Sequence, residues 1–72
     1  MDRTILVVIG KNIKKYRLKC GLTQEQLAEK VNIHPTYVGK LEAGKNNPST
    51  LTLDAIATSV GVSLEDLVRV RN

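Results

Sequence analysis

The sequence predicts an all-α domain of five helices, and two kinds of local signal support this fold class. The first is a set of helix-ending residues, each following a stretch in which apolar residues recur with helical spacing: Gly21, Asn32, Gly44 and Gly61. The second is a set of matching helix starts. Together these signals divide the chain into five helical segments and no strand. A chain of 72 residues makes one domain, expected over residues 1–72.

The start signals are capping boxes and hydrophobic staples. Thr23 and Gln26 have the spacing in which two side chains satisfy free backbone N–H groups at a helix start. Ser63 and Asp66 form an acidic version of the same arrangement. Hydrophobic staples, which pair an apolar residue before the cap with one inside the helix, occur as Leu22 with Leu27, Ile33 with Val38, and Val62 with Leu67.

The second and third helices are expected over Gln24–Val31 and Pro35–Ala43. His34 is the expected N-cap of the third helix, and Pro35 occupies the first helical position, where its missing N–H costs nothing. The connection between the two helices is too short for antiparallel packing, so they must cross steeply. Asn32 tolerates the positive φ that this chain reversal needs.

Helical periodicity predicts one small, mainly aliphatic core. Its expected members are Ile9, Ile13, Tyr16, Leu27, Ala28, Val31, Val38, Leu41, Leu53, Ile56, Ala57, Val60, Leu64 and Leu67, with Val68 assigned either to the core or to a subunit interface. Other apolar residues are not needed by this core, namely Leu6, Val7, Val8 and Val70. A small core with unused apolar residues favours a homodimer.

The charge balance favours an anionic partner. The chain has 11 Lys and Arg against 7 Asp and Glu, a formal net charge of +4. The positive charge is concentrated in one segment without acids, at Lys11, Lys14, Lys15, Arg17 and Lys19. On charge alone, a solvated helix face explains this segment as well as a phosphate-facing surface does.

Several classes of function are disfavoured. The single cysteine, Cys20, cannot form an internal disulfide, and with the single histidine, His34, it cannot build a metal site. The apolar run Ile5–Ile9 is too short to span a membrane or to act as a signal peptide. No nucleophile and base stand at catalytic spacing. We therefore expect a cytoplasmic protein without metal, cofactor or enzymatic activity.

Three stretches of the sequence, "GLTQEQLAEKV", "LEAGKNNPS" and "LDAIATSVGVSLEDL", resemble the phage-repressor and Cro-like helix-turn-helix proteins of the XRE family. The resemblance covers roughly Ile9 to Leu67. Within the family, the chain is similar in layout to the small controller proteins that regulate restriction–modification genes. The resemblance implies a lambda-repressor-like DNA-binding domain with the helix-turn-helix at the second and third helices. The implied function is a transcription regulator that binds a palindromic operator as a homodimer, without a small-molecule effector.

In this family the third helix lies in the major groove of DNA. The resemblance therefore implies base contacts from its outward-facing residues, which are Thr36, Tyr37, Gly39 and Lys40. Thr36 can bond a base or touch a thymine methyl, and Lys40 can donate to guanine. Gly39 indicates close approach to DNA, with tight packing against the second helix or neutral drift as the alternatives. Without the surrounding motif, we would interpret these residues as an ordinary polar helix surface.

The resemblance also implies phosphate contacts and an internal ion pair. Family members grip the DNA backbone with the glutamine that corresponds to Gln24, at a helix start that favours phosphate. The second glutamine that braces it in several repressors is replaced here by Pro35. Further phosphate contacts are expected from His34, which is first a helix cap, and from the loop residues Lys45, Asn46 and Asn47, for which a plain turn is the alternative. The implied ion pair joins Arg17 to Glu42.

The same fold also serves as an antitoxin or another protein-interaction module, and the short stretch after the fifth helix disfavours that alternative. A dimer interface through the fifth helix and the C-terminal tail, with Val68 and Val70, is favoured over one built from Leu6, Val7 and Val8, because the resembling proteins dimerise through the former region.

Overall fold

The computed structural model describes residues 3–70 and confirms the all-α prediction, because this part of the chain contains five helices and no strand. The helices are α1 (Thr4–Lys19), α2 (Gln24–Val31), α3 (Pro35–Glu42), α4 (Thr50–Val60) and α5 (Leu64–Val68). Helix α3 ends one residue earlier than predicted, since Ala43 is its C-cap. The first two and last two residues of the predicted domain lie outside the described part.

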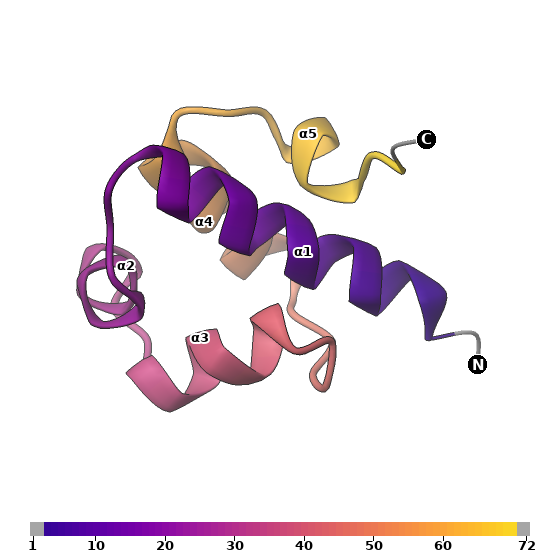
Figure 1. The fold of residues 1–72 in the computed structure, drawn as a ribbon, viewed down its shortest axis with the longest axis horizontal. Coiled ribbons are helices and arrows are strands. Elements are labelled where there is room, and N and C mark those ends of the chain that lie inside the picture. The colour runs from indigo at the N-terminus through magenta and orange to yellow at the C-terminus, as the bar shows by residue number, and fades with distance from the viewer. Residues whose placement is uncertain (1–2, 71–72) are drawn as a thin grey trace.

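Helix α1 is the central element of the fold. In Figure 1 it crosses the molecule with α3 on one side and α5 on the other, while α4 lies behind it. The packing agrees with this view, because α1 contacts α3, α4 and α5, and α2 contacts α3 and α4. The helix-turn-helix segment, α2 and α3, therefore lies on the opposite side of α1 from α5.

The predicted helix-start and helix-end signals are confirmed by the structure. The helix-ending residues all have positive φ, namely Gly21 at 71°, Asn32 at 57°, Gly44 at 72° and Gly61 at 75°. Capping boxes are present at Thr23 and Ser63. The start of α4 is capped by Ser49, which accepts a hydrogen bond from the Thr52 N–H at 3.1 Å. The sequence analysis did not identify that cap.

The buried core follows the predicted helix faces, with two corrections. Leu6 is buried, because it lies on the same face of α1 as Ile9 and Ile13, one turn earlier. Its expected exclusion from the core was therefore wrong. Val68 is 37% exposed, so its alternative assignment to the core was also wrong. Partly buried residues at the edge of the core include Tyr16, Val31 and Leu64.

A close helix crossing depends on Gly10, which the sequence analysis overlooked. A Cβ atom on Gly10 would lie 2.5 Å from the Leu41 carbonyl oxygen and 2.6 Å from the Glu42 carbonyl oxygen. These atoms belong to the backbone at the end of α3, so they cannot move aside as a flexible side chain would. Gly10 therefore lets α1 lie directly on the last turn of α3.

We predict that Gly10→Ala destabilises the fold. Forcing a methyl group against fixed backbone should lower the free energy of unfolding by about 1–3 kcal/mol or more. Gly39→Ala is the matched control, because Gly39 also lies inside a helix, but its added Cβ would be 3.7 Å from Gln24 Oε1, the nearest atom of a neighbouring element. The control should gain about 1 kcal/mol from helix propensity. Urea unfolding measures both, and equal effects of the two changes would contradict the prediction.

Candidate nucleic-acid interface

The start of α3 is fixed by local signals in the sequence. His34 Nδ1 accepts a hydrogen bond from the Thr36 backbone N–H at 3.1 Å, and Pro35 occupies the first helical position. Asn32, in the left-handed conformation, ends α2 and turns the chain towards α3. The first turn of α3 is thereby held at the surface in a defined direction.

The residues predicted to contact bases lie along one side of α3. Thr36 and Lys40 are exposed and are separated by one helical turn. Tyr37 is half-buried and packs against the edge of the core. Its ring is therefore held more firmly than a fully exposed side chain. These three side chains supply a hydroxyl, a phenol and an ammonium group from one surface.

Gly39 lies between them and faces α2. A Cβ atom at Gly39 would be 3.7 Å from Gln24 Oε1 and 3.8 Å from Gln24 Nε2, which is ordinary van der Waals contact. Packing against α2 therefore leaves room for an alanine at this position. Contacts within the chain therefore do not require a glycine here.

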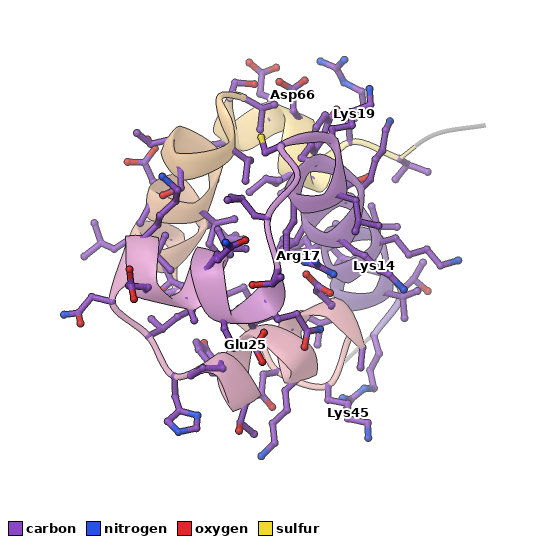
Figure 2. All side chains as sticks on the ribbon, turned by 60° about the vertical axis from the view of Figure 1, so that its left-hand side comes forward. Lys14, Arg17, Lys19, Glu25, Lys45 and Asp66 are labelled. Carbon is purple, nitrogen blue, oxygen red and sulfur yellow. The ribbon has the colours of Figure 1, made fainter. Side chains whose placement is uncertain are left out.

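A network around the Glu42 carboxylate supports this surface from behind. Arg17 Nε donates to Glu42 Oε2 at 2.6 Å, and Arg17 Nη2 donates to Glu42 Oε1 at 3.0 Å. Gln24 Nε2 donates to the same Oε1 at 3.0 Å, and Arg17 Nη1 donates to the Leu22 carbonyl oxygen at 2.8 Å. The ionic side chains are only 8% and 5% exposed. In Figure 2 Arg17 lies inside the molecule, next to α2 and α3.

This network joins three helices at one point. Arg17 comes from α1, Gln24 from the first turn of α2, and Glu42 from the last turn of α3. The hydrogen bonds to Glu42 raise the pKa of Arg17 above its ordinary value, so the guanidinium stays charged. The structure thus contains the ion pair between Arg17 and Glu42. It also gives the Gln24 side chain a bracing role that the sequence analysis did not foresee.

The loop after α3 lies near the same end of the molecule as α3 itself. Lys45 and Asn47 are exposed, and Asn46 is half-buried. Figure 2 shows Lys45 at the opposite end of the molecule from Asp66. Arg3 Nη2 approaches the Lys45 carbonyl oxygen at 3.4 Å, which adds a cation that the sequence analysis did not place here.

The basic segment of α1 is divided among different environments. Arg17 is buried in the network, while Lys15 and Lys19 place their ammonium groups 5.1 and 5.8 Å from the centre of the Tyr16 ring. Lys11 and Lys14 are exposed. The segment therefore does not form a single phosphate-facing stripe.

The described residues contain neither a metal-binding cluster nor a membrane-spanning helix. Among residues 3–70, no group of three or more His, Cys, Asp or Glu side chains could hold a metal ion. No helix in the same part of the chain is long and apolar enough to cross a membrane.

Comparison with known proteins identifies the α2–α3 unit. A model of the helix-turn-helix family HTH_3 matches residues 13–67. The chain belongs to this helix-turn-helix family. The XRE resemblance is thereby confirmed, and the chain is a DNA-binding transcription regulator with its helix-turn-helix at α2 and α3.

The relatives include repressors and control proteins. The immunity repressor of Bacillus phage phi105 is 39% identical over 62 residues, which cover 86% of this chain but only 43% of the repressor. Control protein C.BamHI of Bacillus amyloliquefaciens is 32% identical over 69 residues, covering 94% of this chain and 85% of the relative. The similarity thus extends over nearly the whole control protein and over less than half of the phage repressor.

Solved structures show the same fold. The restriction-modification controller protein C.AhdI of Aeromonas hydrophila superposes with a TM-score of 0.82 at 32% identity, covering 86% of this chain and 94% of that one. The biofilm regulator SinR, solved in complex with DNA, gives a TM-score of 0.80 at 32% identity, covering 85% and 98%.

We predict that breaking the buried ion pair destabilises the helix-turn-helix. Arg17→Met and Glu42→Gln should each lower the free energy of unfolding by about 3–5 kcal/mol, because each leaves a buried charge without its partner. Arg69→Met is the matched control, since Arg69 pairs with Asp66 at 3.7 Å on the exposed surface. That change should alter stability by less than about 1 kcal/mol. Urea melts compare the three variants, and a loss at Arg17 no larger than that at Arg69 would refute the prediction.

Proposed function

We propose that this regulator binds a two-fold symmetric operator as a homodimer, with the start of α3 in the major groove. The observation that carries the proposal is the exposed face of α3, where Thr36, Tyr37 and Lys40 project from a helix whose inner side is fixed by the Glu42 network. A rigid helix with mixed donor and acceptor groups on its outer face suits the readout of base edges.

Each outer residue of α3 has its own part in the proposed readout. Lys40 donates to guanine O6 or N7, and Thr36 bonds a base or packs on a thymine methyl. Tyr37, which is held at the edge of the core, contacts a base step or a phosphate through its ring and hydroxyl. Gly39 lets DNA come close to the helix, because it carries no side chain beside Thr36.

The proposed phosphate contacts surround this face. They are made by Gln24, His34, Lys45, Asn46 and Asn47. Gln24 lies at the start of α2, where free backbone N–H groups attract phosphate, while its side chain is tied to Glu42. His34 keeps its cap through Nδ1, which leaves Nε2 on the exposed ring for a phosphate. These contacts set the register of the protein on DNA without reading sequence.

The proposed dimer interface is α5 with the segment that follows it. Val68 is 37% exposed and Val70 is 66% exposed, so both are available to a second copy. The described part of the chain measures 30 × 21 × 19 Å along its principal axes. Two such copies side by side can place their α3 helices about 34–36 Å apart, the spacing of half-sites one helical turn apart.

We further propose that the regulator acts in the cytoplasm without cofactor, small-molecule effector or catalytic activity. Support comes from the relatives, which are named as a repressor and as control proteins. DNA sequences selected from a random pool test the proposal as a whole. Enrichment of a palindrome supports it, whereas a folded protein that selects no sequence would favour the alternative of a protein-interaction module.

We predict that Lys40 and Lys45 have separable effects on DNA binding. Lys40→Ala should cost about 1–3 kcal/mol on the selected site and flatten the preference at one base pair. Lys45→Ala should weaken all sites alike and make the salt slope shallower by about one unit. Lys14→Ala, at an exposed position of α1, is the control and should change neither property. If Lys40→Ala lowers affinity equally for every sequence, Lys40 is a phosphate ligand.

We predict that Gly39→Ala separates stability from DNA binding. The protein has room for the added methyl group, so the variant should remain folded and become more stable by about 1 kcal/mol. Operator affinity should nevertheless fall about tenfold or more, equivalent to at least ~1.4 kcal/mol, because the methyl group meets DNA. Unchanged operator affinity, measured by fluorescence anisotropy, would show that close approach of DNA does not require this glycine.

A further inference from the structure

Asn12 is a buried polar residue in the middle of α1 that the DNA-binding surface does not use. Asn12 is 7% exposed. Its Nδ2 donates to the Leu67 carbonyl oxygen at 2.8 Å and to the Arg69 carbonyl oxygen at 3.0 Å. The two acceptors are 55 and 57 residues away in sequence. One amide group therefore links α1 to the end of α5.

The end of α5 needs such an external partner. The helix has only five residues, and its C-cap, Arg69, has an extended backbone with φ −72° and ψ 127°. It therefore lacks the left-handed residue that ends α2 and α4 and returns backbone N–H groups to the last carbonyls. The Asn12 amide takes over part of this task, because it donates to the carbonyl of Leu67 inside the helix and to that of Arg69 just beyond it.

The side chains at and after the end of α5 differ in exposure. Leu67 is buried in the core, whereas Val68 and Val70 are exposed. Val70 also lines a groove against α1, together with Val8, Lys11, Asn12, Lys15 and Arg69. Val8 therefore lies on the same surface as Val70, whereas Val7 lies against the backbone of Gly44, on the side of α3.

We infer that Asn12 is a positioning residue for the dimer surface: by tying the carbonyls of Leu67 and Arg69 to α1, it holds Val8, Val68 and Val70 in the arrangement that a second copy recognises. This inference rests on the proposed dimer through α5 and the segment after it. Its physical basis is preorganisation. A segment already fixed in the monomer loses less conformational entropy when a partner binds it than one that must first be ordered.

Asn12→Leu tests this role, because leucine keeps a similar volume and removes the amide donor. We expect the dimer dissociation constant, measured by sedimentation, to rise at least tenfold and affinity for a full operator to fall. Affinity for a DNA duplex carrying a single half-site should stay within about twofold, because the Asn12 amide bonds to the end of α5 and not to α3. A purely structural role would not separate these two DNA measurements. Asn12→Ala provides a second variant if the leucine variant does not fold.

Ile13→Val is the matched control, since Ile13 is the neighbouring buried residue of α1 and makes no hydrogen bond to the segment after α5. Ile13→Val should cause a small loss of stability, comparable to that of Asn12→Leu, but leave the dimer dissociation constant unchanged. If folded Asn12 variants dimerise like the unaltered protein, the inference is overturned while the proposed dimer stands. If the unaltered protein is itself a monomer at tens of micromolar and on DNA, the proposed dimer fails, and this inference fails with it.

Discussion

The structure depends above all on one buried carboxylate, that of Glu42. It receives hydrogen bonds from Arg17 on α1 and Gln24 on α2, and it belongs to the last turn of α3. Two short helices of eight residues each would be marginal alone. The carboxylate fixes their crossing through directional bonds that an apolar contact could not supply. Because the pair is satisfied on both sides, its burial is tolerated.

Helix α1 connects the two functional ends of the molecule. Gly10 brings it against the last turn of α3, and Asn12, two residues later, ties it to the end of α5. Residues facing different directions on one helix thus serve the recognition helix, the core and the proposed dimer surface. The helix is long enough, at 16 residues, to reach all three. This explains why it carries the two buried polar residues identified in the described part, Asn12 and Arg17.

Local signals in the sequence predicted most of the fold, whereas contacts between distant segments were harder to predict. Capping boxes and positive-φ residues act over three or four positions, so Thr23, Ser63 and Gly61 could be interpreted from their neighbours alone. Gly10 and Asn12 could not, because their partners lie far along the chain and depend on how the helices pack. Arg17 and Glu42 were placed through the family resemblance. The residues predicted to contact DNA lie at the surface. Which contacts they make depends on the DNA, and the protein sequence alone does not specify it.

The separation between the outer face of α3 and the Glu42 network has an evolutionary consequence. Neither the Thr36 side chain nor the Lys40 side chain, both exposed, takes part in the hydrogen bonds to Glu42 that hold α3 in place. Substitutions at these positions can therefore accumulate without a loss of folding, whereas Gly10, Arg17 and Glu42 tolerate few replacements. A duplicated gene with this architecture can acquire a new target site through a few exchanges on one helix, and its descendants can diverge in specificity while remaining recognisable by their unchanging interior.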